Sequence, residues 1–395
     1  MITKRIFIAA LAASAFALAA NAESMNRDEA VAQIIENNLR LKALAKEHQA
    51  DATELKVAGR LNSQPEVEFE HMWGPESNRK WNIGVTQGFD WPGVYKRRAR
   101  EADARIGAFE YLYKAEQRQV TLEARLTIDN ATYVNKQLTL TDHIISNVNK
   151  VKKKVSTAYQ HGQVTLLDIK KIDFELYSLN AKRAELQQQL DALKSQLSTL
   201  NGGDSLNVDL NAYMPQSLLS ADEYSSLAVK NNPSVKAAMQ NAEAARLASR
   251  TAAAERLPGF SLGYRHAYEE NTHFNGFSVG ISLPVFTNKA ASKAADIRAI
   301  ALSFEASETA TAQKARINAT YTDAARRGQS LREMSKVVLE NNYPDLLLMA
   351  YNGGQINVIT YLQELSFFES AQSEYLAAEY AYITDLTTLN TLTQE

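Results

Sequence analysis

Residues 28–43 read DEAVAQIIENNLRLKA, and residues 222–237 read DEYSSLAVKNNPSVKA. The acidic pair, the asparagine pair and the final Lys-Ala coincide when the second stretch is moved back by 194 residues. Two later stretches, YQHGQ at 159–163 and YNGGQ at 351–355, coincide at a displacement of 192. A repeat of this length is far longer than a solenoid unit. The sequence therefore predicts a duplicated half-domain whose two halves are structural equivalents.

The amino terminus has the features of a cleaved secretory signal. Lys4 and Arg5 precede an apolar run over residues 6–20, and Ala20-Asn21-Ala22 ends it with small residues. The run is shorter than the roughly 20 residues of a membrane-spanning helix, so we prefer a signal over residues 1–22 to a membrane anchor. The mature protein is thus expected to leave the cytoplasm.

Composition excludes several classes of function. The chain has no cysteine, so we expect neither disulfides nor thiol chemistry, and no lipid anchor on a cysteine. A net charge of -2 and a pI near 6.4 do not indicate a partner made of nucleic acid.

The placement of proline predicts long helices. No proline lies between Pro92 and Pro215, and this stretch is rich in Ala, Leu, Lys, Glu and Gln. We expect two helices that reverse near Gly162, the first running from about residue 93 to 159 and roughly 100 Å long at 1.5 Å per residue. The returning helix has the 4-3 apolar spacing of a coiled coil, with Ile172, Leu176, Leu179, Leu186, Leu190, Leu193, Leu197 and Leu200. The second half repeats this spacing more loosely, with Phe368, Ala371, Tyr375, Ala378, Tyr382, Leu389 and Leu392.

A different pattern separates the first helix of each half, expected near 26–62 and 221–256, from its long helix. There, apolar and polar residues alternate, which predicts strands with one apolar face, near 65–73 and 80–90 in the first half and near 258–268 and 274–286 in the second. Strands of about 9 to 11 residues are long enough to cross a bilayer when tilted, and dyad alternation is typical of membrane barrels. A soluble, half-buried hairpin has the same pattern and stays an alternative.

The three tryptophans lie at the ends of the predicted strands. Trp73 and Trp81 flank the first hairpin tip and Trp91 lies at the opposite end, where membrane barrels carry aromatic belts. Four strands cannot close a barrel, and an open sheet edge is not tolerated in lipid. The chain is therefore expected to oligomerise, and three copies supply twelve strands and a wide lumen.

The order helix, strand pair, long helix, glycine turn and returning helix, given twice after a signal peptide, resembles the TolC-type outer-membrane efflux channels. The resemblance covers essentially the whole mature chain. Residues 36–38 (ENN) and 230–233 (KNNP) look like the family's transition from helix to strand, and Gly162 and Gly354 occupy the glycine place of its tip turns. Residues 85–93 (VTQGFDWPG), followed by KRR at 96–98, look most like the CzcC/CusC cation-efflux branch.

The resemblance implies a mainly α-helical protein with a membrane β-barrel contribution. It implies a homotrimer with a twelve-stranded barrel in the outer membrane and an α-helical barrel through the periplasm. We expect a signal peptide at 1–22, a first repeat at 23–203, a linker at 204–220 and a second repeat at 221–395. The helical hairpins are expected at 93–200, with a tip near 160–163, and at 289–392, with a tip near 352–355.

The function implied by the resemblance is that of the outer-membrane channel of a tripartite efflux system. Such a channel is a passive exit duct for metal cations or drugs that docks on a periplasmic adaptor and an inner-membrane pump. The expected partners are other copies of the chain, the adaptor, the pump and outer-membrane lipid. A channel for type I protein secretion and a secreted coiled-coil adhesion protein without a pore remain alternatives.

The family's gates lie at the periplasmic tips. Asp168 matches an acidic position after the first turn, and Tyr351 matches the tyrosine that opens the second, so we hypothesise that they approach each other in the closed state. A solvated carboxylate favoured by the helix dipole is the alternative for Asp168. Well-studied members carry charged residues where this chain has Ile356, Thr360 and Gln363, so a ring of gate carboxylates is not expected. The tip turns contain Gly162, Gly353 and Gly354, and the candidates for adaptor contact, with a solvated face as the alternative, are Lys150, Lys152, Lys153 and Lys154.

No catalytic arrangement is found, and we expect no enzyme activity, cofactor or fixed metal site. Residues 259–263 (GFSLG) and 276–280 (GFSVG) both match G-x-S-x-G, but they are predicted to lie within continuing strands rather than at a strand-to-helix turn. Small side chains inside a barrel explain them better. The six histidines show no metal-ligand spacing.

Overall fold

The computed structural model of the chain describes residues 24–61, 64–74, 79–283, 289–338 and 343–394, so the predicted signal at 1–22 lies outside the described part. The first half contains α1 (Arg27–Asn37), α2 (Leu39–Leu55), β1 (Glu66–Trp73), β2 (Arg79–Phe89), α3 (Pro92–Gln160) and α4 (Leu166–Leu200). The second half contains α5 (Ala221–Lys230), α6 (Pro233–Ala254), β3 (Gly259–Glu269), β4 (Thr272–Ser282), α7 (Lys289–Val338), α8 (Tyr343–Asn352) and α9 (Val358–Thr393). Within the described ranges, no helix is long and apolar enough to cross a membrane.

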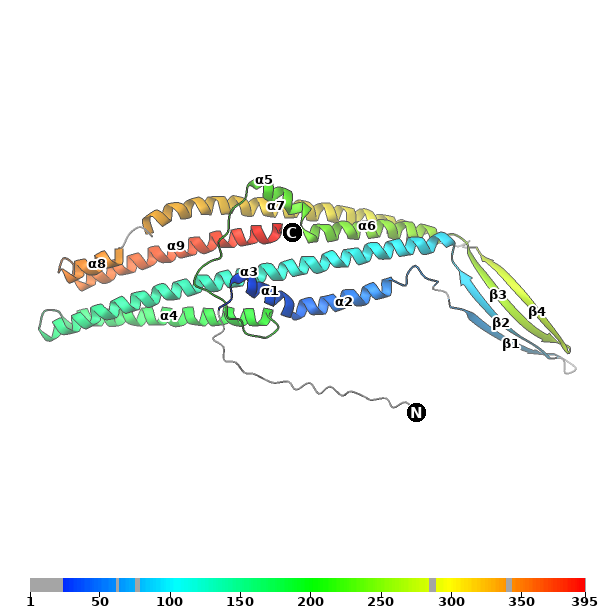
Figure 1. Ribbon diagram of the computed structural model, residues 1–395, viewed down its shortest axis with the longest axis horizontal. Helices are drawn as coiled ribbons and strands as arrows, with labels where there is room; N and C mark the ends of the chain where they lie inside the picture. The colour runs from blue at the N-terminus through cyan, green and yellow to red at the C-terminus, as the bar shows by residue number, and fades with distance from the viewer. Residues whose placement is uncertain (1–23, 62–63, 75–78, 284–288, 339–342, 395) are drawn as a thin grey trace, which may run out of the picture.

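The molecule is elongated, with the sheet at one end and the α3–α4 and α8–α9 turns at the other (Figure 1). Helix α3 has 69 residues and runs along the helical part, which at 1.5 Å per residue is about 100 Å. The long helix predicted from the proline-free stretch is thus confirmed. We call the residues around the two turns the tip.

The four strands form one antiparallel sheet in the order β1-β2-β3-β4. The central pair joins the two halves, because β2 pairs with β3, with Val85 opposite Tyr264. All four predicted strands are present within two residues of their expected starts, whereas β4 ends at Ser282, and residues 284–286 of its expected range lie outside the described residues.

Equivalent helix starts use equivalent caps. Asn26 and Glu29 form a capping box at α1, and Ser220 and Glu223, 194 residues later, form the same box at α5. In such a box the first side chain accepts a bond from the helix backbone and the glutamate accepts one from the cap. The repeat read from the sequence therefore has a physical counterpart at the start of each half.

The helix that precedes each strand pair is broken, contrary to the single helices expected at 26–62 and 221–256. Asn38 has ψ 117, outside the helical region, and its side chain accepts a bond from the Leu41 N–H to start α2. In the second half Asn232 caps α6, whose first residue is Pro233. A proline fits the first position of a helix but cannot continue one. The two asparagine motifs therefore join helix to helix, and the predicted transition from helix to strand at 36–38 and 230–233 was wrong.

The second helical hairpin also differs from the expected continuous one. Helix α7 ends at Val338 and α8 begins at Tyr343, with residues 339–342 outside the described part. Pro344 is the second residue of α8, where a missing N–H costs little because the first turn leaves its N–H groups unpaired. Pro344 in the interior of one long helix would remove a hydrogen bond, so its presence is consistent with a new helix start.

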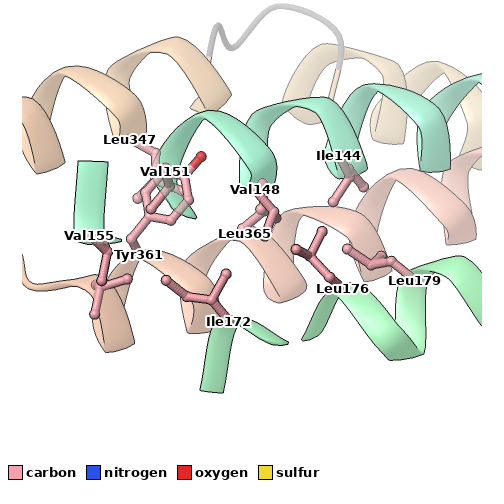
Figure 2. Close-up of a cluster of buried hydrophobic side chains, with 11 residues drawn as sticks. Ile144, Val148, Val151, Val155, Ile172, Leu176, Leu179, Leu347, Tyr361 and Leu365 are labelled. Atoms are coloured by element: carbon pink, nitrogen blue, oxygen red, sulfur yellow. The ribbon is translucent and has the colours of Figure 1, made fainter. Parts of the chain in front are cut away.

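The tip has a hydrophobic core that both halves share (Figure 2). Val148 and Val151 of α3 and Ile172 of α4 are fully buried, and they pack with Tyr361 and Leu365 of α9. Most of the predicted α4 seam is buried: Ile172, Leu176, Leu179, Leu186, Leu190 and Leu197. Arg183, which interrupts the seam, instead forms an exposed ion pair with Asp142 at 2.6 Å.

Candidate functional site

The sheet has one apolar and one polar face, because residues opposite each other in the register share a face. Val67, Val85, Tyr264 and Phe277 form one row across β1 to β4. Phe277 is 89% exposed and Val279, two residues along, is 75% exposed. A contiguous exposed apolar surface of this kind marks contact with lipid or with another protein.

The opposite face is polar and carries paired charges. Arg265 contacts Glu68 at 3.1 Å, and Lys80 contacts Glu269 at 2.7 Å. Asn82 donates a 2.6 Å hydrogen bond to Glu70. Cross-strand pairs of opposite charge stabilise a sheet and fix its register.

Small residues on the polar face let adjacent strands carry serines opposite glycines. A Cβ atom at Gly263 would lie 2.5 Å from the Ser278 hydroxyl, too close for any side chain. Both G-x-S-x-G stretches therefore lie in continuing strands, in β3 and β4, as the alternation predicted. Neither has the sharp turn that exposes a nucleophilic serine.

Aromatic residues gather at the ends of the sheet. Near the hairpin tips, the Trp81 ring stacks on Tyr268 with centroids 5.9 Å apart, and Trp73 is 79% exposed. At the helical end, the Trp91 ring lies 5.4 Å from Phe260. The tryptophans thus lie at both ends of the sheet, and their role as an aromatic belt stays a prediction.

Two histidines meet on the apolar face, which their separation along the sequence did not reveal. His273 Nδ1 lies 3.2 Å from His266 Nε2, and His266 Nδ1 lies 2.7 Å from Asn275 Oδ1. These atoms form a chain of hydrogen bonds across β3 and β4. Within the described ranges, no group of three metal-ligating side chains is found.

The first tip turn is set by a glycine and a capping box. Gly162 has φ +72, a backbone conformation that residues other than glycine rarely adopt. Asp168 Oδ2 accepts hydrogen bonds from the Thr165 N–H at 2.9 Å and from its hydroxyl at 2.7 Å. These bonds lower the pKa of Asp168 because they favour the carboxylate. Within one chain, Asp168 is therefore an exposed carboxylate at the start of a helix, which is the alternative to a gate residue.

The second tip turn repeats the geometry with neutral groups. Gly354 also has φ +72, whereas Gly353 is not in the left-handed region. Asn357 caps α9 by accepting a 2.9 Å bond from the Thr360 N–H. The Tyr351 ring lies 5.4 Å from the Tyr361 ring, and burial raises the pKa of Tyr351.

The predicted gate residues are not brought together within one chain. Among the described residues, the contacts of Asp168 are with its own turn and the ring contact of Tyr351 is with Tyr361. Gln363 is exposed on α9. The approach of Asp168 to Tyr351 therefore stays a prediction that concerns neighbouring copies.

The four lysines before the tip divide into two kinds. Lys152 pairs with Asp173 at 2.8 Å, and Lys154 donates a 2.5 Å hydrogen bond to Asn352, so these two hold neighbouring helices together. Lys150 bonds Asn147 on its own helix, and Lys153 is exposed. Contact with an adaptor, if it uses this cluster, is thus expected mainly from Lys150 and Lys153.

A buried polar cluster links the two halves, and the sequence did not predict it. Arg27 of α1 contacts Asp129 of α3 at 3.1 Å, and Thr387 of α9 donates a 2.6 Å bond to the same carboxylate. Gln216, in the linker at 204–220, donates to Thr387 at 2.8 Å. Burial raises the pKa of Asp129, and the charge of Arg27 opposes that shift. The sequence gives no signal for this pairing, because Asp129 lies in a stretch of mixed polarity and its partner Arg27 is 102 residues away.

Comparison with protein-family models gave no match, and comparison with curated protein sequences gave none either. Solved structures do match. The outer-membrane channel OprN has a TM-score of 0.75 at 15% identity, over 93% of this chain and 89% of that chain. The CmeC outer-membrane channel of Campylobacter jejuni has a TM-score of 0.78 at 13% identity, over 93% of this chain and 85% of that chain.

The chain has the fold of the TolC-type outer-membrane channels. The predicted fold class is thus confirmed, with a helical body and a small antiparallel sheet. CusC also matches, with a TM-score of 0.68 at 15% identity over 94% of this chain and 92% of that chain. Because this score is no higher than those of the other TolC-type structures, the cation-efflux branch is not singled out. The matched structures named here are channels and not enzymes.

Proposed function

We propose that this protein is the outer-membrane channel of a tripartite efflux system and acts as a passive exit duct. The observation that carries the proposal is the sheet, which has an exposed apolar face and from which α3, a helix of about 100 Å, extends. The fold shared with OprN, CmeC and MtrE, which are described as outer-membrane channels, supports it.

The duct is completed by three copies of the chain. Strands β1 and β4 are the outer strands of the sheet, and no further strand pairs with them within the described ranges. Such an edge in lipid would leave its backbone groups unbonded, which costs several kcal/mol for each group. Three copies joined from β4 to β1 form a closed barrel of twelve strands, with the apolar face outward and the polar face toward the lumen.

The proposed location is the outer membrane for the sheet and the periplasm for the helices, with no lipid anchor. The tip then lies about 100 Å from the sheet, where a periplasmic adaptor and an inner-membrane pump dock. The exposed Lys150 and Lys153 are the proposed adaptor contacts.

The gate is proposed at the tip. Asp168 and Tyr351 approach each other between neighbouring copies in the closed state, with Thr360 and Gln363 beside them. The Thr165 N–H and hydroxyl both donate to Asp168 Oδ2, which leaves Oδ1 for a tyrosine hydroxyl. A double variant, Asp168→Ala with Tyr351→Phe, is expected to raise single-channel conductance in a planar bilayer. Unchanged conductance together with unchanged drug and metal sensitivity counts against this gate.

The proposed cargo is metal cations or drugs, and a deletion strain distinguishes them. If the deletion strain becomes sensitive to metal cations only, the resemblance of residues 85–98 to the CzcC/CusC branch is supported. If it becomes sensitive to many hydrophobic drugs, drugs are the cargo instead. Loss of export of one protein, with unchanged sensitivity to both, assigns the channel to protein secretion instead. A protein found soluble without detergent, with no ion conductance in a bilayer, overturns the channel proposal itself.

A further inference from the structure

A cleft of about 410 Å³ lies about a third of the way along the helical part from the sheet, between α3, the start of α6 and the end of α9. We call it the α3–α6 cleft. Lys114, Arg118 and Lys236 line it together with Tyr111 and Thr121, and no lining residue is acidic. Its volume lies within the range of small-molecule sites.

Among the described residues, the two lysines of the cleft have no acidic partner. Lys114 Nζ lies 5.6 Å and Lys236 Nζ 5.9 Å from the centre of the same Tyr111 ring. No ion pair or hydrogen bond involves either ammonium group within the described ranges. Glu110, four residues before Lys114 on α3, forms no ion pair with it within the described residues, and Glu116 is paired with Arg40 at 2.8 Å. Both ammonium groups therefore lie near one ring in the same cleft, and an anion bound there is attracted by two like charges.

Arg118 adds a third charge whose position is fixed by the backbone. Its guanidinium donates to Asn231 O at 3.3 Å and to Leu392 O at 3.0 Å, and it also bonds Gln394 O. These carbonyls belong to the ends of α5 and α9, where the helix dipole is negative. Because no carboxylate of the described residues pairs with Arg118, its charge stays available to the cleft.

Lys236 occupies a place where a helix disfavours a cation. It lies in the first turn of α6, which begins at Pro233 and has 22 residues. The first turn of a helix carries positive partial charge, favours anions and disfavours cations. A lysine there, facing two more cations, is stabilised when an anion binds.

We propose that the α3–α6 cleft binds a small soluble oxyanion of the phosphate class. Lys114 and Lys236 hold the charge, and Arg118 adds a third cation at the wall of the cleft. Tyr111 lies 19 residues after the first residue of α3, so the cleft is roughly 30 Å from the sheet. Lipid headgroups at the end of a barrel do not extend that far, which favours a free phosphate or phosphomonoester. The preference for a soluble ligand rests on the proposed location of the sheet in the membrane, whereas anion binding by the cleft does not depend on the channel function.

The test is calorimetric titration of the intact detergent-solubilised protein with inorganic phosphate. The double variant Lys114→Gln with Lys236→Gln is expected to bind phosphate at least about tenfold more weakly, because each hydrogen bond to a charged group contributes to affinity. The matched control, Lys42→Gln with Lys314→Gln, removes the same charge from exposed sites and is expected to bind as the unmodified protein does. Equal weakening in both variants, or no phosphate binding by the unmodified protein, overturns the proposal.

Two further experiments distinguish soluble phosphate from other occupants of the cleft. Vesicles of phosphatidylglycerol are expected not to compete with phosphate, and competition that depends on Lys114 and Lys236 overturns the soluble ligand. Glu395 follows Gln394 in the sequence and lies outside the described residues, so E395Q is the second arm. The proposal expects unchanged phosphate affinity in E395Q. A rise in phosphate affinity of tenfold or more in E395Q would show that the lysines pair with the Glu395 carboxylate instead.

Discussion

The two halves have the same order of elements but differ in how their long helices are built. In the first half α3 is continuous over 69 residues, whereas in the second α7 and α8 have 50 and 10 residues. The strands differ less, with 8 residues in β1 and 11 each in β2, β3 and β4. Both halves thus contribute an antiparallel strand pair to the sheet, whereas the helices near the tip differ in whether they are continuous.

The same divergence appears in single residues at the tip. Lys152 and Asp173 form an ion pair in the first half, and the positions 192 residues later are Pro344 and the buried Leu365. Asp168, which completes a capping box, corresponds to Thr360. The first hairpin is therefore held partly by surface charges, and the second partly by apolar burial. Unequal hairpins can respond unequally to pH, salt or mutation.

The largest expected effect comes from the buried cluster that joins the halves. Asp129→Ala leaves Arg27 buried without its partner, which is expected to destabilise the protein by about 4 kcal/mol. The control Asp142→Ala removes the exposed pair with Arg183 and is expected to cost less than about 1 kcal/mol. Denaturant unfolding of the solubilised protein measures both. Equal effects would show that the halves do not depend on this cluster.

Next is the core that the two hairpins share. Ile172→Ala in α4 and Leu365→Ala in α9 remove buried side chains of the same cluster, and each is expected to cost about 3 kcal/mol. Leu167→Ala, at a position that is 64% exposed, is expected to change stability by no more than about 0.5 kcal/mol. If only Leu365→Ala proved destabilising, the first hairpin would not contribute to the common core. Denaturant unfolding of the solubilised variants measures these three changes in stability.

A smaller effect is expected from the two caps at the tip. Thr165→Ala and Asn357→Ala each remove the side chain that accepts from the third helical N–H, and each is expected to cost about 1 kcal/mol at neutral pH. Similar losses would confirm that the turns are equivalent in structure. A loss at only one turn, measured by hydrogen exchange of the first helical turn, would contradict it.

The smallest effect is a pH response of the first turn alone. The folded pKa of Asp168 lies below its ordinary value of about 3.9, so the stability that this carboxylate contributes is fully present above that value. It is lost as pH falls through the folded pKa. Hydrogen exchange at the start of α4 is expected to accelerate in that acidic range, beyond the change at α9, where Thr360 does not titrate. The variant Asp168→Asn is expected to abolish the difference, and a difference that persists would refute this cause.

Much of the architecture followed from the sequence because it rests on local chemistry. Period-two alternation located the strands, the proline-free stretch located α3, and the glycines located both tip turns. The breaks at Asn38 and Asn232 were missed because asparagine is tolerated in helices, and only its backbone angles and capping bond show that the helix stops there.

The contacts between distant segments could not be predicted in this way. Asp129 meets Arg27 and Thr387, which are 102 and 258 residues away, and no spacing rule connects them. The basic cleft likewise brings Lys114 to Lys236 only when α3 packs against α6. The gate pair, Asp168 with Tyr351, lies beyond a single chain altogether, since it is proposed between copies.

The central claim is that three copies close one barrel through the outer edges of β1 and β4. Glu66 and Ser282 lie on these edges, at the helical end of the sheet and on its polar face. Glu66 is level with Ser278, so in one chain Glu66 and Ser282 are separated by three strand spacings across the sheet and four residues along it, roughly 20 Å. In the proposed trimer they lie on the two strands that meet at the seam between copies. Because the chain has no cysteine, Glu66→Cys with Ser282→Cys can be cross-linked cleanly in outer-membrane fractions. The account predicts a covalent ladder that ends at the trimer, and a ladder that continues past the trimer, or monomer alone, would contradict it.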